Sequence, residues 1–293
     1  MPPNRFRVRH RTEYQYGRPM ADGFTMVHLA PRPSAHQTVE SFQLVVTPQP
    51  DEWEDMADPF GNPVSRFAVH HPHDSLLIES ELVVLAQVPD AVPWSPPWDD
   101  VARTVAGLRG DAAREVAPYL AHTEQTPVLA GLQHLTDAEF WPRRPVADVV
   151  SAICQHIFSE FVFDAGFSDV TTPLHTVLEQ RRGVCQDFAH VGVSAIRSMG
   201  LPARYVSGYI ETLPPPGQPK LVGVDASHAW CSVWCGEVGW LDFDPTNNQM
   251  PPMRHITVGW GRAYDDVAPV RGVVIGPGGD QQLHVAVDVA HLP

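Results

Sequence analysis

Three residues with the chemistry of nucleophilic catalysis occur in order along the chain. Cys185 follows a break at Gly183 and stands at the first turn of a segment with helical periodicity. The N-terminus of a helix carries a partial positive charge and free N–H groups, which favour the thiolate, the nucleophilic form of cysteine. Farther along, His228 opens an apolar strand and Asp244 closes the next one. A cysteine, a histidine and an acid in this order are the parts of a triad with a cysteine nucleophile, and we predict such a triad here.

The acid of this triad has two candidates. Asp242 and Asp244 lie on the same face of one predicted strand, so alternation alone does not choose between them. Neighbouring strands are about 4.8 Å apart. An acid at the end of one strand can therefore reach a histidine on its neighbour.

A zinc site is a second interpretation of the histidine strand, because Cys231 and Cys235 follow His228. Strand alternation places both cysteines on the face opposite His228, and structural zinc sites prefer four ligands at turn-like spacing. No acidic loop has the spacing of a calcium site. The sequence thus predicts neither a metal nor an organic cofactor.

The composition limits the class of protein. The chain has 293 residues, is 43% hydrophobic and 18% charged, and has a formal net charge of -14. A packed core is feasible, and the acidic balance argues against nucleic acid or an anionic membrane as a partner, because both bind clustered lysine and arginine. No apolar stretch approaches roughly 18 residues, and the first residues lack the apolar region of a secretory signal. Four cysteines do not make a disulfide framework. We expect a cytoplasmic protein.

Periodicity divides the chain into three parts. Residues 1–90 alternate apolar and polar side chains and predict an antiparallel β-sandwich domain. We expect residues 91–144 to form a linker and helical connection, and residues 145–293 to form the core that carries the predicted triad, with a C-terminal tail. The elements expected from the middle of the chain onward are helices at 111–120, 148–158 and 184–199 and strands at 203–210, 229–235 and 239–243.

The motifs around the three residues resemble those of the transglutaminase-like superfamily. They are Gly-Val-Cys-Gln-Asp-Phe-Ala-His at 183–190, Gly-Leu-Pro-Ala-Arg-Tyr at 200–205, Ser-His-Ala-Trp at 227–230 and Asp-Pro-Thr at 244–246. Residues 10–16, the turn Asp-Pro-Phe-Gly-Asn at 58–62 and the tail at 261–273 are similar to the outer parts of the bacterial members.

This resemblance implies a papain-like α+β fold, with the nucleophile helix packed on an antiparallel sheet. It also implies that Cys185 attacks, that His228 serves as base and later as acid, and that Asp244 orients the imidazole. Phe163 stands where many relatives have a tyrosine, so the hydroxyl that would help to hold an oxyanion is absent. The backbone N–H of Cys185 is the oxyanion donor that remains.

These observations predict a cysteine enzyme that acts on amide bonds of peptide or protein substrates through a thioester acyl-enzyme. Hydrolysis of peptide, isopeptide or other amide bonds is the preferred reaction. Protein-glutamine transamidation is the alternative within the same chemistry, because both reactions share the acyl-enzyme. A non-catalytic protein-binding module that keeps the fold is the alternative outside it.

Overall fold

Strands with a two-residue period build a β-sandwich at one end of the molecule. In β1 (Asn4–Met20), Phe6 and Val8 are buried while Arg9 and Arg11 face solvent. This alternation is the pattern expected when only one face of a sheet meets the core. The computed structural model describes residues 4–87, 94–212, 227–250, 254–276 and 280–293.

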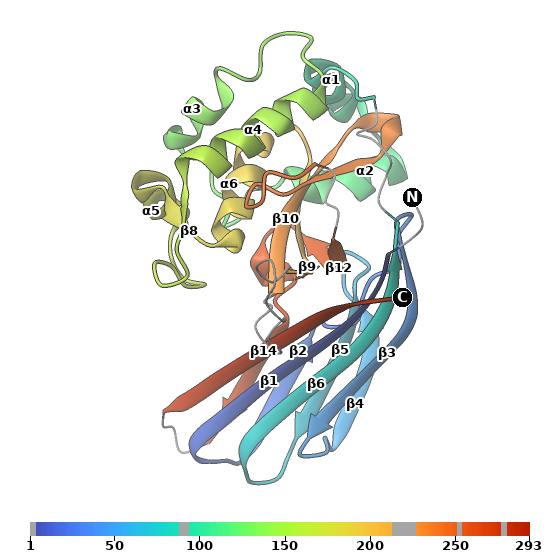
Figure 1. Ribbon diagram of the computed structural model, residues 1–293, viewed down its shortest axis with the longest axis vertical. Coiled ribbons are helices and arrows are strands. Elements are labelled where there is room, and N and C mark those ends of the chain that lie inside the picture. Colours follow the sequence, from blue (N-terminus) through green and yellow to red (C-terminus); the bar gives the residue numbers. More distant parts are fainter. Residues whose placement is uncertain (1–3, 88–93, 213–226, 251–253, 277–279) are drawn as a thin grey trace.

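The sandwich consists of two four-stranded sheets in which all paired strands are antiparallel (Figure 1). The first sheet contains, in spatial order, β14 (Gln281–Leu292), β1, β6 (His73–Ala86) and β3 (Gln37–Thr47). The second contains β13 (Val270–Ile275), β2 (Asp22–Val27), β5 (Pro63–Val69) and β4 (Glu52–Ala57).

The last two strands of the chain complete the sandwich. The sequence predicts residues 145–293 to be one core with a tail, but in the structure β14 pairs with β1 and β13 pairs with β2. Without them, β1 and β2 would be edge strands with unpaired backbone groups. Val287 of β14 is buried in the same apolar cluster as residues of β1 and β6. The sandwich is therefore built from both ends of the chain.

The other end of the molecule is a mixed α/β core. Its antiparallel sheet has the order β11 (Trp240–Phe243), β10 (Ser227–Trp234), β9 (Ala203–Ile210) and β12 (His255–Gly261). The short strands β7 (Val162–Phe163) and β8 (Arg182–Gly183) pair in parallel. The α-helices are α1 (Trp98–Gly107), α2 (Gly110–Val116), α3 (Gln133–Thr136), α4 (Val146–Glu160), α5 (Leu174–Gln180) and α6 (Cys185–Ser198). Single 3₁₀ turns are η1 (Ala117–Leu120), η2 (Ala130–Leu132), η3 (Gly236–Val238) and η4 (Tyr264–Asp266).

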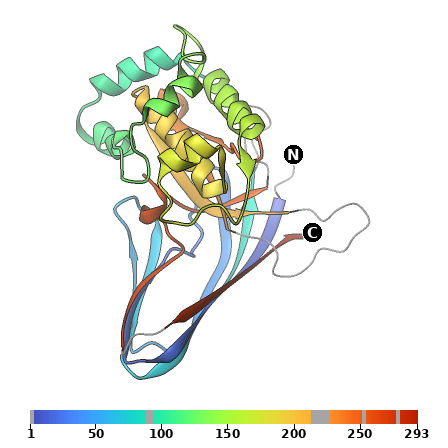
Figure 2. The ribbon, with the colours of Figure 1, turned by 90° about the vertical axis from the view of Figure 1, so that its left-hand side faces the viewer.

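The helix α6 lies at the centre of this core. It packs on β9 and β10 on one side and meets α3, α4 and α5 on the other (Figure 2). Its residues from Asp187 to Arg197 are all buried. Gly192 allows the helix to approach β10 closely, because an added Cβ would lie 2.9 Å from Sγ of Cys231. The expected fold, with the helix that begins at Cys185 packed on an antiparallel sheet next to a β-sandwich, is confirmed.

Two amide side chains join β12 to the sandwich. Gln37 of β3 accepts from the N–H and donates to the carbonyl of Thr257, and Asn62 makes the same pair of bonds with Trp260. Asn62 is itself held by Asp58, whose carboxylate accepts from the backbone and side-chain amides of Asn62. The turn at 58–62 thus fixes the position of a strand of the core sheet.

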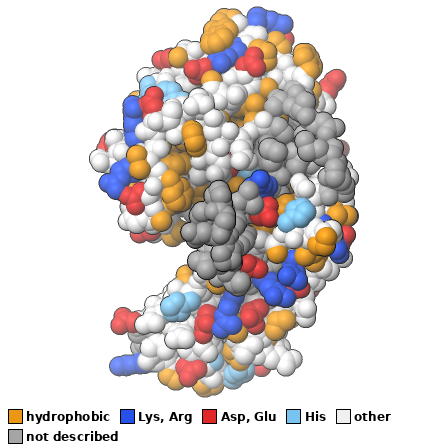
Figure 3. Space-filling model, viewed as in Figure 1, with side chains coloured by type: hydrophobic (Ala, Val, Ile, Leu, Met, Phe, Trp, Pro, Cys, Tyr) orange, Lys and Arg blue, Asp and Glu red, His pale blue; other side chains and the backbone are white. Residues whose placement is uncertain are grey.

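The outer face of the first sheet carries paired charges. Basic and acidic side chains lie next to one another over this sheet (Figure 3), and they include the ion pairs Arg9–Glu81 at 2.5 Å and Arg11–Glu13 at 3.0 Å. Among the described residues, no helix is both long enough and apolar enough to cross a lipid bilayer.

The role of β14 in the sandwich can be tested with one pair of substitutions. Val287→Asp should lower the free energy of unfolding by roughly 3–5 kcal/mol, because it buries an unpaired carboxylate. Val285→Asp is the matched control, since Val285 lies on the same strand but is 52% exposed; it should change the stability by less than about 0.5 kcal/mol. Urea denaturation measures both. Equal, small effects would show that β14 is a dispensable tail.

Candidate active site

A tight local structure places Cys185 at the start of α6. Gly183 belongs to β8, Val184 is extended, and the helix begins at Cys185. The carboxylate of Asp187 accepts a hydrogen bond from the N–H of Val184 at 2.8 Å and another from the hydroxyl of Ser168. An added Cβ on Gly183 would lie only 2.6 Å from Oδ2 of Asp187, so this approach requires glycine. The acidic residue in the first turn is thereby paired with groups other than the thiol.

The structure brings the three predicted residues together. Nε2 of His228 lies 2.8 Å from Oδ2 of Asp244, which leaves Nδ1 as the second ring nitrogen. Burial alone would lower the pKa of His228, but the interactions with Asp244 and the nearby Cys185 outweigh it and raise the pKa to about 10. The ring is therefore an imidazolium at neutral pH, and Cys185 is partly exposed.

Asp244 is fully buried and is held by five donors. Its Oδ2 meets Nε2 of His228, Nε2 of His255 and the side-chain amide of Asn247, at 2.7–2.8 Å. Its Oδ1 accepts from the backbone N–H groups of Thr246 and Asn247. Burial would raise the pKa of Asp244, but the hydrogen bonds from the two histidines lower it well below its ordinary range. Asp244 is a fixed negative charge.

Asp242, the other candidate for the acid, has a different partner. Its Oδ2 accepts from the indole N–H of Trp230 at 3.2 Å. Trp230 in turn stacks on the ring of His228 with a centroid distance of 6.1 Å. Asp242 therefore bonds to Trp230, which packs against His228, whereas Asp244 contacts His228 directly.

His255 is a functional candidate that the sequence reasoning missed. It opens β12 and is buried, and its ring lies 5.3 Å from that of His228 and 4.9 Å from that of Trp230. Burial lowers the pKa of His255 despite the nearby carboxylate of Asp244. A neutral His255 presents Nε2–H to Asp244. Its only signal in the sequence was a histidine at the start of an alternating strand, one of 15 in the chain.

A glycine in β9 leaves room for the rings of His228, Trp230 and His255. Gly208 of β9 is paired with His228 in the sheet. A Cβ at Gly208 would lie 2.0 Å from the carbonyl oxygen of Ile256 and 2.8 Å from the Trp230 ring. The absence of a side chain at Gly208 therefore leaves space for the Trp230 ring, which packs against His228 and His255.

The remaining reactive side chains near the site are part of the core. Cys231 and Cys235 belong to the hydrophobic cluster under α6, and the thiol of Cys231 contacts the carbonyl of Ala189 at 3.3 Å. His190 accepts from the N–H of Tyr264, and burial lowers its pKa to about 3.

Phe163 is 57% exposed and is the direct partner of Gly183 in the pairing of β7 with β8. It supplies an apolar surface at the position where the resemblance to the superfamily predicts a tyrosine hydroxyl.

His228, Asp244 and His255 have donor atoms within 4.8 Å of one another, which is close enough for a metal ion. Both Nε2 atoms, however, already contact the same oxygen of Asp244, and Asn247 donates to that oxygen as well. The side chains form a hydrogen-bond network around one carboxylate, in which Nδ1 of His255 has no partner among the described residues. It needs no ion to explain its geometry.

Two family models match the chain. The model of the bacterial transglutaminase-like N-terminal region matches residues 6–85, and the model of the transglutaminase-like superfamily matches residues 137–245. An uncharacterized protein of Mycobacterium tuberculosis is 37% identical over 98% of this chain and 92% of its own length. The chain belongs to the transglutaminase-like superfamily.

Further comparisons extend this result. An uncharacterized protein of Mycobacterium leprae is 33% identical over 98% of this chain and 99% of its own length. A protein-glutamine gamma-glutamyltransferase of Pseudomonas aeruginosa is 38% identical over 76 residues, which are 26% of this chain and 11% of that protein. A crystal structure from Cytophaga hutchinsonii, named as a candidate cysteine protease, covers all of this chain and 92% of its own, with a TM-score of 0.76 and 23% identity. It shows that the fold is shared.

The charge state of His228 should depend on Asp244. In the wild-type protein the ring should stay protonated at pH 8, because its pKa is about 10. In Asp244→Asn the remaining effect of burial should lower this pKa, so the ring should be neutral at pH 8. ¹⁵N NMR of the imidazole, assigned with His228→Gln, measures this. Asp242→Asn is the matched control and should leave the ring protonated.

The same shift has a consequence for stability. The folded-state pKa of His228 lies above its ordinary value of 6.5, so its contribution to stability is complete below pH 6.5 and is lost as the pH rises through about 10. In Asp244→Asn, the free energy of unfolding should no longer show this decrease as the pH rises through about 10. A pKa near 6.5 for His228 in the wild-type protein would contradict its ion pair with Asp244.

His255 should be needed to satisfy Asp244. His255→Leu removes one donor from a buried carboxylate and should lower the free energy of unfolding by about 1.5–3 kcal/mol. His255→Gln keeps an N–H donor and should lose less. Chemical denaturation at pH 7 compares the two variants. If both are equally stable, the hydrogen bond of His255 to Asp244 contributes nothing.

Proposed function

We propose that the protein is a cysteine enzyme that hydrolyses amide bonds of peptide or protein substrates. Cys185 is the nucleophile, His228 is the acid and base, and Asp244 holds the imidazolium. The observation that carries the proposal is that a buried, ionised Asp244 holds the ring of His228, and that Cys185 lies near enough to this ring to raise its pKa. A non-catalytic scaffold has no physical need for such an arrangement, because burying these charges costs stability.

The proposed reaction proceeds through a thioester. The thiolate of Cys185 attacks the carbonyl carbon, and the backbone N–H of Cys185, at the open start of α6, faces the developing oxyanion. His228 gives its proton to the leaving amine as the C–N bond breaks. Neutral His228 then takes a proton from water, which attacks the thioester and releases the acid and the thiolate. Asp244 stays ionised throughout.

The acceptor decides between hydrolysis and transfer. Cys185 is partly exposed, so water reaches a thioester on it without a further binding site. Transfer to an amine needs a site that holds the amine and keeps water out. The short match to a protein-glutamine gamma-glutamyltransferase supports transamidation as the second candidate. The exposed ring of Phe163 near Gly183 offers an apolar contact for either substrate.

Alkylation should be specific to one thiol. Iodoacetamide at pH 6 should label Cys185 alone and faster than a free thiol, because the imidazolium of His228 stabilises the thiolate. The other three cysteines are buried; burial raises the pKa of Cys235 to about 12 and raises those of Cys154 and Cys231 as well. Peptide mass spectrometry locates the label. His228→Asn should slow it to the rate of an ordinary thiol.

Turnover then separates the candidate functions. The protein is incubated with amide- and glutamine-bearing peptides, with and without a primary amine, and Cys185→Ala is the control. We expect the acid product to dominate in both cases. Amine incorporation in excess of the acid product would assign transamidation instead. A Cys185 that alkylates no faster than a free thiol would favour a binding module.

A further inference from the structure

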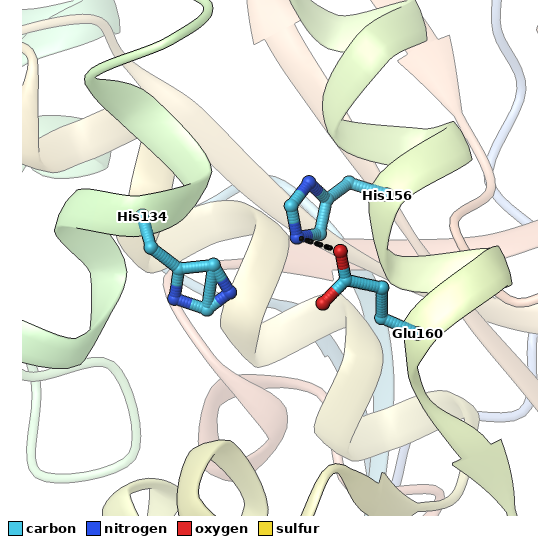
Figure 4. A group of neighbouring side chains, drawn as sticks. All are labelled: His134, His156 and Glu160. Carbon is cyan, nitrogen blue, oxygen red and sulfur yellow. Dashed lines mark ion pairs between the residues drawn. The ribbon is translucent and has the colours of Figure 1, made fainter.

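A second cluster of potential ligands lies on the helical side of the core, outside the Cys185 site. His156 and Glu160 are four residues apart on α4 and share one face of that helix. His134 comes from α3, which packs on α4 and brings its ring to 5.1 Å from the ring of His156. One donor atom from each of the three side chains lies within 4.8 Å of the other two (Figure 4).

Neighbouring groups orient each of these side chains. Nδ1 of His134 lies 3.1 Å from the carbonyl oxygen of Gly131. A ring nitrogen that meets a carbonyl must carry the proton, so Nε2 of His134 keeps a free lone pair. This backbone contact is the usual way in which proteins fix a histidine for metal binding.

The two residues of α4 are also prepared. Nε2 of His156 is shielded from solvent and lies 2.9 Å from Oε1 of Glu160, without the geometry of a hydrogen bond. The other carboxylate oxygen of Glu160 pairs with Arg181. One oxygen of Glu160 is therefore held in place, and the other remains available as a single ligand.

We propose that His134, His156 and Glu160 bind one divalent metal ion of the zinc class. Two imidazoles and one carboxylate suit Zn²⁺, whereas Mg²⁺ and Ca²⁺ prefer oxygen ligands alone. With metal–ligand distances of about 2.0–2.2 Å, the donors of a tetrahedral site are ~3.3 Å apart. To bind the ion, the donor atoms of His156 and Glu160, now 2.9 Å apart, must move slightly apart. The exposed ring of His134 must move slightly toward them.

The ion would connect three parts of the core. It would join α3 to α4, and Glu160 would connect it to Arg181, whose carbonyl accepts from the N–H of Val162 in β7. Arg181 lies four residues before Cys185. A ligand that binds only the folded protein stabilises it, so metal should raise the melting temperature.

The test is a zinc titration of the full-length chain by isothermal calorimetry. It is done in a Cys185→Ser background, so that the thiol beside His228 does not bind zinc. We expect one ion per chain. His134→Gln and His156→Gln should each weaken binding by at least roughly tenfold. His284→Gln, at an exposed position on β14, is the matched control and should bind like the parent.

Two further readouts keep the result independent of folding. His134 is exposed, so His134→Gln should melt at the same temperature as the parent without metal and should lose the rise in melting temperature that zinc gives. Co²⁺ in place of zinc should give visible d–d absorption that His134→Gln abolishes. Equal zinc affinity in the parent and in both histidine variants would overturn the proposal, as would the absence of binding below about 1 mM.

Discussion

The site depends on one buried carboxylate. Asp244 is fully shielded from solvent, and an ion in that position is tolerated only when donors surround it. Those donors come from three segments: His228 on β10, the turn that contains Thr246 and Asn247, and His255 on β12. The carboxylate therefore joins two strands of the core sheet and also sets the charge of the ring next to Cys185.

This requirement extends into the sandwich. His255 reaches Asp244 only if β12 is in register, and β12 is bonded to the sandwich through Gln37 and Asn62. Asn62 belongs to the turn at 58–62, whose resemblance to bacterial relatives now has a physical meaning. The sandwich is closed by β13 and β14, which follow β12 in the chain. The N-terminal region thus supports the site through the strand that carries His255.

Local patterns in the sequence predicted most elements of the core well. The helix expected at 184–199 is α6 (Cys185–Ser198), the helix expected at 148–158 is contained in α4, and the strands expected at 203–210 and 239–243 match β9 and β11 closely. These segments have strong periodicity or clear end signals. The same patterns could not predict that β13 and β14 return to the sandwich, because strand pairing over such distances leaves no local signal.

The sequence by itself predicted a nucleophile, its histidine and a short choice of acids, because a cysteine at a helix start and a histidine opening a strand are local features. Alternation along the strand did not separate Asp242 from Asp244, and the resemblance to the superfamily implied Asp244. The tertiary structure places Asp244, just after β11, against His228, whereas Asp242 within β11 bonds to Trp230. It also brought in His255, which is separated from His228 by 27 positions and joins it through a shared carboxylate. Contacts between distant segments arise from packing, and packing is settled only when the whole chain folds.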